Sequence, residues 1–306
     1  MSEPISIPTA QPPGAWRRLV RNRVAVAAMV LLAAVVLLAI LGPSIFRYSP
    51  EIPTAAKLVP PSAAHWFGTD MNGRDVFSRV IQGARISLIV GLCGALVSFF
   101  VGTTYGLISG YIGGRTDNAM MRFVEVLHSV PRLIIVIVAI FTFAPWLETT
   151  LHRMMPSVEG YAKIMILILC LGLIEWLAMA RIVRGQVLAL KEQQFVLAAR
   201  ALGQSHTRIL VRHLLPNLIG VIVVYLTLTI PAVILDESFL SFLGLGINDP
   251  QASWGSLLSD GKNVINPIHS YWWLLLFPAA AMSLTLVALN FLGDAIRDAL
   301  DPRARQ

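Results

Sequence analysis

The sequence predicts an all-α polytopic membrane protein with six transmembrane helices. Of its 306 residues, 56% are hydrophobic and 13% are charged, and the mean hydropathy is +0.70. A chain with so little charge cannot cover the surface of a water-soluble domain. Apolar runs long enough to cross a bilayer as helices recur along it, separated by polar segments. The composition therefore excludes a water-soluble enzyme or binding protein.

Six segments qualify as spans, and the first begins close to the N-terminus. Its apolar run is longer than the hydrophobic region of a signal peptide, and no typical cleavage site follows, so we expect a retained helix. The third span is the least regular, because charged residues occupy its first half and Pro131 interrupts it. We expect that polar half to project at the cytoplasmic end and to pack against protein. The expected spans are residues 24–41, 86–111, 120–146, 161–182, 218–235 and 271–292.

The distribution of Lys and Arg predicts that both termini are cytoplasmic. With this orientation the inner segments carry twice as many basic residues as the outer ones, as the positive-inside rule requires. Trp146 and the aromatic residues 271–273 would then form a belt at the outer interface. Topology thus accounts for the net charge of +7 without a nucleic-acid partner. The inner basic residues are Arg17, Arg18, Arg21, Arg23, Arg115, Arg122, Arg132, Arg181, Arg184, Lys191, Arg200, Arg208, Arg212, Arg297, Arg303 and Arg305.

This topology divides the chain into two tails, a first helix, an outer segment and a five-helix core. The N-terminal tail is rich in proline before Trp16, and we expect that part to be disordered. Cys93 and Cys170 fall inside expected spans, where they act as small hydrophobic residues and indicate no disulfide or metal site. The parts are residues 1–23, 24–45, 46–85, 86–293 and 294–306, with a coupling segment at 192–214 and an outer segment at 236–270 inside the core.

The polar segment at 192–214 predicts two short helices joined at a glycine. The first has an apolar face at helical spacing and ends at Gly203, which readily adopts a left-handed cap. The second is expected to start at Ser205, with Arg208 and Arg212 on one face. Such a knob is too polar to cross a bilayer and too apolar for water, so it predicts a protein partner. The apolar face of the first helix comprises Phe195, Ala198, Ala199 and Leu202.

The same segment resembles the cytoplasmic coupling motif of ABC importer permeases. That motif reads E-A-A, three residues, G, nine residues, I, one residue, L-P, and it departs here at Leu197 and His213. The histidine is typical of the dipeptide and oligopeptide branch, in which R-H-x-L-P-N is usual. The alternative is an amphipathic loop helix that lies on the bilayer surface. The residues that the resemblance places against an ATPase subunit are Ala198, Ala199, Arg200, Gly203, Arg208, Arg212, His213, Leu215 and Pro216.

An outer segment at residues 68–79, G-T-D-M-N-G-R-D-V-F-S-R, resembles a signature of the same branch, G-T-D-x-x-G-R-D-x-x-S-R. Arg74 and Arg79 lie on the side that the positive-inside rule disfavours. We therefore expect a protein partner or an internal ion pair to hold them. The candidate contacts to an extracytoplasmic binding protein in this segment are Asp70, Gly73, Arg74 and Asp75.

A second outer signature, E-S-F-L-S-F-L-G-L-G at residues 237–246, is too apolar for an exposed loop. Its glycines would interrupt a spanning helix, so we expect a short helix that dips back or lies over the mouth of the bundle. In the family this region forms part of the outer gate and of the surface beneath the binding protein. The alternative is a lid helix that only packs against the bundle. The candidate residues are Glu237, Phe242, Gly244, Gly246 and Trp254.

The end of the chain, N-F-L-G-D-A-I-R-D-A-L-D-P-R at residues 290–303, is similar to the end of C-type subunits of oligopeptide permeases. The run M-A-R-I-V-R-G-Q at 179–186 also favours that branch. The resemblance covers the chain from about residue 16 and implies the MetI-like fold of type I ABC importer permeases. It implies a subunit for ATP-driven oligopeptide uptake. Dipeptide, nickel-chelate and glutathione importers share the signatures, so these cargoes stay open.

The resemblance also implies a heteromeric complex in the bacterial plasma membrane, surrounded by lipid. Its other members would be a homologous second permease, two ABC ATPase subunits, alike or different, and an extracytoplasmic peptide-binding protein. ATP and Mg would be bound by the ATPases, and no cofactor or metal by this chain.

The sequence contains no catalytic motif for an enzyme. The nearest approach to a phosphate-binding loop, at 255–263, has one residue too many between its glycines and Asn263 in place of Ser or Thr. Glu175 is the only acid clearly inside an expected span, where it either lines the transport pathway or bonds to a neighbouring helix. An ion-driven secondary carrier, the other alternative, predicts internal repeats and paired acids, and no repeat is visible.

Overall fold

The computed structural model describes residues 15–154, 161–264 and 268–300 as a bundle of helices. Six of the helical segments in these ranges are long and apolar enough to cross a membrane, as the sequence predicts. The expected disorder of the proline-rich tail falls on residues 1–14, outside the described residues. The helices are α1 (Ala15–Arg21), α2 (Arg23–Ile45), α3 (Val76–Ile112), α4 (Gly114–Ser129), α5 (Arg132–Met154), α6 (Ala162–Leu190), α7 (Gln194–Ala201), α8 (His206–Ile209), α9 (Leu215–Phe242), α10 (Trp254–Val264) and α11 (Trp273–Leu300).

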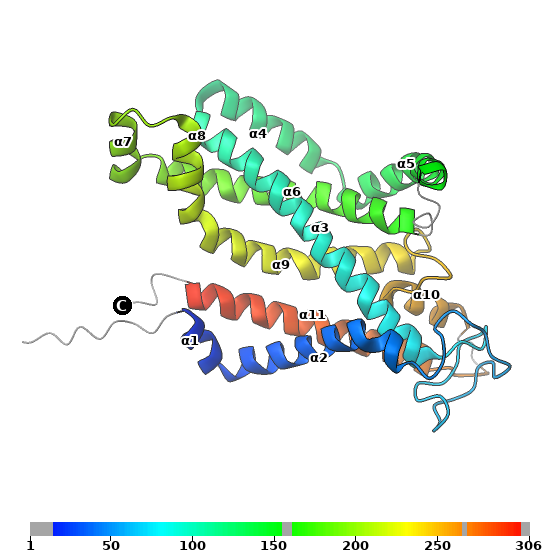
Figure 1. Cartoon of the computed structure of the whole chain (residues 1–306). Helices are drawn as coiled ribbons and strands as arrows, with labels where there is room; N and C mark the ends of the chain where they lie inside the picture. Colours follow the sequence, from blue (N-terminus) through cyan, green and yellow to red (C-terminus); the bar gives the residue numbers. More distant parts are fainter. Residues whose placement is uncertain (1–14, 155–160, 265–267, 301–306) are drawn as a thin grey trace, which may run out of the picture.

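The long helices α3, α6 and α9 form the centre of the bundle, and α3 packs along both of the others (Figure 1). On one side of this centre α2 packs on α11. On the other side α4 packs on α3 and α6, and α5 packs on α6 (Figure 1). The short helices α7 and α8 lie at the same end as α1 and the end of α11. The loop at 46–75 and helix α10 lie at the opposite end. One end of the bundle therefore carries short helices, and the other carries a long loop and α10.

All six spans have limits that differ from those expected. The fourth and sixth continue to Leu190 and Leu300, so α11 includes the start of the expected C-terminal tail, and three further differences affect the candidate sites. Helix α3 already begins at Val76, because Asp75 caps it by accepting from the Ser78 backbone N–H at 2.9 Å. The third span is two helices, since Val130 is extended before Pro131 and the polar half forms α4.

The fifth span continues to Phe242, so residues 237–242 are part of α9 and do not form the expected separate helix over the mouth. The short helix at this end is α10.

Glycines on α3 allow it to approach α6 more closely than side chains would permit. Gly102, Gly106 and Gly110 recur every fourth residue, so they lie on one face of the helix. A Cβ atom on Gly102 would lie 2.6 Å from Met179 Cβ, and one on Gly106 would lie 2.5 Å from the Ala180 carbonyl oxygen. Small residues at this spacing are the usual means by which membrane helices pack closely.

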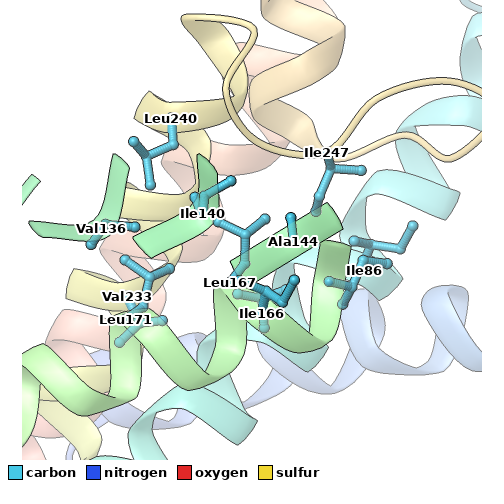
Figure 2. Close-up of a cluster of buried hydrophobic side chains, with 12 residues drawn as sticks. Ile86, Val136, Ile140, Ala144, Ile166, Leu167, Leu171, Val233, Leu240 and Ile247 are labelled. Atoms are coloured by element: carbon cyan, nitrogen blue, oxygen red, sulfur yellow. The ribbon is translucent and has the colours of Figure 1, made fainter. Parts of the chain in front are cut away.

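An apolar core in the half of the bundle away from α7 and α8 joins α3, α5, α6 and α9 (Figure 2). Val136 and Ile140 of α5 lie against Leu167 and Leu171 of α6, and Val233 of α9 is close by. All five side chains are buried. This cluster holds α5 to the bundle although most of that helix is exposed in the single chain.

Replacing Gly106 by Val should destabilise the protein, because the added atoms would meet the α6 backbone, which cannot move aside as a flexible side chain can. We expect a loss of about 1–3 kcal/mol, the usual cost of overpacking. Thermal unfolding of the detergent-purified protein measures it. The matched control is Gly185→Val on α6, where a Cβ atom meets nothing within 4 Å. Equal midpoints for the two variants would contradict a role of the glycine face in packing.

Candidate coupling, outer and pathway sites

The segment between α6 and α9 consists of two short helices joined at a glycine, and the second passes into a π-helical turn. Helix α7 ends at Ala201, two residues before Gly203, whose φ of 71° is in the left-handed region, and the Gln204 N–H donates to the Ala199 carbonyl at 3.1 Å. Ser205, in an extended conformation, then occupies the N-cap position of α8 without a side-chain hydrogen bond to the helix. A π-helical turn, η2 (Leu210–Leu214), joins α8 to α9, and Pro216 stands in the first turn of α9. We call α7, α8 and η2 the coupling knob.

The coupling knob is packed firmly on the ends of three long helices. Val196, Ile209 and Leu214 are fully buried, and they join a cluster that includes Tyr111 of α3 and Val187 of α6. The expected apolar face of α7 is divided, because Ala199 is buried in this chain while the other three residues point outward. The small side chain of Ala199 therefore serves packing within the subunit. The cluster leaves the knob little freedom to move apart from the bundle.

Polar contacts fix the knob to the end of α3. The Tyr111 hydroxyl and His206 Nδ1 are 2.8 Å apart, and the Arg200 guanidinium lies 5.2 Å from the centre of the Tyr111 ring. His213, which replaces the isoleucine of the motif, hydrogen-bonds through Nε2 to Gln204 Oε1 at 2.9 Å. The substituted histidine therefore ties η2 to the turn that follows Gly203.

A second polar contact closes the same end of the bundle. Arg184 of α6 donates through Nε and Nη2 to the two carboxylate oxygens of Asp117 on α4, each at 2.6 Å. Ser109 of α3 donates to the same carboxylate at 2.6 Å. The hydrogen bonds from Arg184 hold the pKa of Asp117 below its usual value. Three helices thus meet at one ionised carboxylate.

The outward face of the knob combines apolar and basic side chains. Leu202 is 80% exposed, and Phe195 and Leu197 on the same short helix segment are exposed as well, so this face carries several apolar side chains. Arg208 and Arg212 are exposed, and neither has an ion-pair partner within the described ranges. This face has the chemistry of an interface with an acidic, partly apolar partner. Its exposed residues are Phe195, Leu197, Ala198, Leu202, Arg208 and Arg212.

An ionic cluster, which we call the outer cluster, holds the opposite end together. Asp70 Oδ2 accepts from Arg74 Nε at 2.7 Å and from Arg79 Nη1 at 2.5 Å. Asp249 Oδ1 accepts from the same two arginines at 2.8 and 3.1 Å, and Asp260 Oδ2 lies 3.3 Å from Arg79. Internal ion pairs therefore hold both arginines, one of the two alternatives expected. Asp249 and Asp260 were not predicted, because they come from a distant loop and from α10.

The outer cluster contains three carboxylates and two guanidinium groups. Burial alone would raise the pKa of Asp70, but the Arg74 backbone N–H and the positive charges of Arg79 and Arg74 lower it. The pKa of Asp260 is raised, chiefly because burial removes its water. Asp70 is therefore the permanent anion of the cluster, and Asp260 is the carboxylate that takes up a proton more readily.

The other candidates in the first outer segment serve its internal structure. Gly73 has φ of 84°, and a Cβ atom there would collide with the Thr54 carbonyl oxygen. Asp75 is buried, and besides capping α3 it bonds to His65 Nδ1 at 2.9 Å. Asp70, Arg74 and Asp75 are each at most 5% exposed, so they offer little surface to a binding protein.

The second outer signature is also more deeply buried than expected. Glu237 is fully buried and accepts hydrogen bonds from Ser87 at 3.1 Å and Ser241 at 2.7 Å. A direct contact with a binding protein is excluded in this conformation. Trp254 is fully buried as well, and its Nε1 donates to the Val80 carbonyl oxygen at 3.2 Å. Hydroxyl donors satisfy the Glu237 carboxyl group, which is why α9 can continue past it.

The remaining residues of this signature end α9. Phe242 is the last residue of the helix, and its ring lies 4.5 Å from Lys262 Nζ of α10. Gly244 has φ of 79° and is exposed, while Gly246 is buried against Ser241. The turn at Gly244 therefore reverses the chain so that the loop before α10 covers the end of the bundle.

Near the middle of the bundle, Arg132 at the start of α5 joins two acidic residues. Its Nη1 donates to Glu175 Oε1 of α6 and its Nη2 to Asp236 Oδ1 of α9, both at 3.0 Å. Glu175 is therefore not the only acid inside a span. Asp236 was missed because the expected fifth span ended one residue before it. The combination of Arg132 with two acids near apolar runs was the available signal.

Replacing Asp70 by Asn should destabilise the outer cluster. Two buried arginines would lose their shared anion, and removal of one partner from a buried ion pair costs about 3–5 kcal/mol. Because the pKa of Asp70 is lowered on folding, its contribution is complete above its unfolded pKa of about 4 and is lost as the pH falls through the folded pKa.

Thermal midpoints across acidic pH measure both effects. The variant should unfold earlier at neutral pH and decline less in acid, whereas the control Asp298→Asn, at an exposed carboxylate, should follow the wild type. An unchanged acid decline in Asp70→Asn would contradict the role of this carboxylate.

Comparisons with known proteins identify the family of the chain. Residues 102–306 match the family model described as binding-protein-dependent transport system inner membrane component. Residues 14–61 match the model for the N-terminal transmembrane domain of oligopeptide transport permease C. Together the two matches include the coupling knob and most of the bundle.

Curated relatives agree with the family models. The dipeptide transport system permease protein DppC of Bacillus subtilis is 46% identical over 95% of this chain and 86% of its own length. The oligopeptide transport system permease protein OppC of Escherichia coli K12 is 45% identical over 95% of this chain and 91% of its own length. Both relatives are therefore similar over nearly their whole sequences.

Among solved structures, the inward-facing MetNI methionine ABC transporter matches with a TM-score of 0.53 and 16% identity, covering 72% of this chain and 96% of that chain. At this identity the likeness shows the fold alone, which is the expected MetI-like fold. The chain therefore belongs to the inner membrane component family of binding-protein-dependent ABC transport systems, as a multi-pass transport subunit.

Proposed function

We propose that this chain is a permease subunit of an ATP-driven importer that takes up oligopeptides delivered by an extracytoplasmic binding protein. The observation that carries the proposal is the coupling knob, which is fixed to the bundle on one side and presents apolar and basic residues on the other. The relatives named as oligopeptide and dipeptide permeases support a peptide as cargo. Dipeptides, nickel chelates and glutathione are the alternative cargoes.

The knob transmits motion because its contacts reach the long helices directly. An ATPase subunit that closes on ATP pushes the face around Leu202 and Arg208. The Tyr111–His206 contact and the buried cluster pass this displacement to α3 and α6. A packed interface of this kind moves as a unit, so a small shift at the knob reorients whole helices. The cavity between this subunit and a second permease then opens alternately to the two sides.

The complex contains a homologous second permease, two ATPase subunits that bind ATP and Mg, and the binding protein. The knob and both termini face the cytoplasm, and the outer cluster faces the binding protein. The arrangement of charges supports this orientation, since Arg200, Arg208 and Arg212 gather at the knob. At the other end, Arg74 and Arg79 are neutralised within the outer cluster.

Replacing Leu202 by Glu should release the ATPase subunits. Burying a leucine contributes about 1.5–3 kcal/mol, so loss of this contact should lower their recovery about tenfold or more. The measurement is the amount of ATPase that co-purifies with the tagged permease, expressed with its genomic neighbours. The control is Leu243→Glu, which alters an exposed leucine at the opposite end. Full recovery of ATPase with the Leu202 variant would contradict the docking role of the knob, and absence of any ATPase with the wild type would favour a carrier.

Cysteine labelling tests the orientation. In a background with Cys93 and Cys170 replaced by Ala, the variants Trp66→Cys and Leu202→Cys each carry one thiol at an exposed position at opposite ends. Expressed without the ATPases, only the Trp66 variant should react with a membrane-impermeant reagent in intact spheroplasts, and both should react after permeabilisation. The reverse pattern would overturn the orientation.

A further inference from the structure

A cavity of about 460 Å³ opens beside the break between α4 and α5. Its wall includes the extended backbone at Val130 and Pro131, one face of α6 around Glu175, and Tyr225 of α9. Irregular backbone is tolerated at membrane depth only where it is buried in protein or lines a cavity. Glu175 lies near the middle of α6, about 20 Å along the helix from Ala162. The cavity therefore lies level with the middle of α6, and the exposed residues 128–132 border its open side in the single chain.

The charged side chains at the cavity differ in how far they are exposed. The Arg132 side chain is 52% exposed, whereas those of Glu175 and Asp236 are 12% and 9% exposed. Arg132 and Glu175 line the cavity, and Asp236 is not among its lining residues. Glu175 uses Oε1 for Arg132, and its Oε2 has no hydrogen-bond partner in the portion of the chain that the structure describes. One carboxylate oxygen is thus available to a ligand.

The charges of this group do not balance. Two carboxylates share one guanidinium group, which leaves one negative charge in excess. The next cation along α6, Arg181, donates to His128 at 3.1 Å and does not line the cavity. An uncompensated charge away from bulk water is costly, and a cation that enters the cavity removes that cost. The site therefore favours a cationic ligand group.

A second cavity of about 360 Å³ adjoins the first, and Ile135 and Ile174 line both. Its other walls are apolar and include Phe143 and Trp146 of α5 and Leu169 of α6. A ligand that spans the two cavities would carry a cationic group next to an apolar group. The N-terminal residue of a peptide has this form, with an ammonium group on the carbon that bears the side chain.

We propose that Glu175 accepts the N-terminal ammonium group of a peptide in transit, while the adjoining apolar cavity takes its first side chain. Arg132 is a positioning residue, which holds one oxygen of Glu175 and is itself held by Asp236. The inference rests on the proposed function and adds to it the part of the substrate that this subunit recognises. It also explains why a costly carboxylate stands in the middle of α6.

The test compares trialanine with N-acetyl-trialanine, which lacks the cationic group. ATP-driven uptake of each is measured with the complete importer and its binding protein in vesicles. Selection by the binding protein is the same for every permease variant, so it cancels when ratios are compared. Glu175→Gln keeps the size of the side chain and should lower the free-to-acetylated ratio about tenfold, the effect of losing one charged hydrogen bond. The control Glu148→Gln, on α5 but outside both cavities, should keep the wild-type ratio.

A second measurement needs neither the binding protein nor a change at Glu175. Ala178 lines the charged cavity, and the Ala178→Cys variant, with Cys93 and Cys170 replaced by Ala, places a thiol there. Trialanine should slow the reaction of this thiol with a water-soluble reagent in the purified complex. The acetylated peptide should protect it at least about fivefold less at equal concentration, since it lacks the charged hydrogen bond.

The outcomes separate the two proposals. An unchanged uptake ratio in Glu175→Gln, with both rates lowered equally, would assign the residue a structural role and overturn the inference. Equal protection of the Ala178→Cys thiol by both peptides would overturn it as well. Wild-type vesicles that show no ATP-driven uptake of either peptide would instead overturn the proposed function, and the inference with it.

Discussion

The close approach of α3 to α6 positions both the coupling knob and the other long helices. Because Gly102, Gly106 and Gly110 carry no side chains, the two helices touch along their backbones. This contact brings the end of α3 to the coupling knob, where Tyr111 meets His206. The same pair of helices therefore forms the centre of the bundle and the surface on which the coupling knob packs. Helix α9 packs against both helices.

The two ends and the middle of the bundle treat charge differently, for one physical reason. Away from water an ion must be paired, and the pair must be satisfied by further hydrogen bonds. At the knob end Asp117 is enclosed by donors from α3 and α6, and at the other end Asp70 is enclosed by two arginines. Of these three groups, the one at Arg132 leaves a carboxylate oxygen open beside a cavity. The tightly paired clusters fix helices in place, and the open one is suited to a ligand.

Local features of the knob were predictable because each depends on neighbouring residues. The end of α7 before Gly203 and the start of α8 after Ser205 follow from backbone conformations that these residues favour. The limits of α9 were not predictable in this way. Hydropathy falls at Asp236, so the expected span stopped there, whereas serines from α3 and α9 satisfy Glu237 and let the helix continue. That compensation comes partly from residues far along the chain.

The class of the protein, its six spans, the short helices of the knob and the family follow from the order of the amino acids alone. These properties depend on apolar length, on capping residues and on motifs, all of which are local. Which charged side chains meet depends instead on how the helices pack. Asp249 and Asp260 reach Arg79 from a distant loop and helix, and Asp236 reaches Arg132 from another span. Such pairs form between elements that packing brings together, so no spacing within the sequence specifies them.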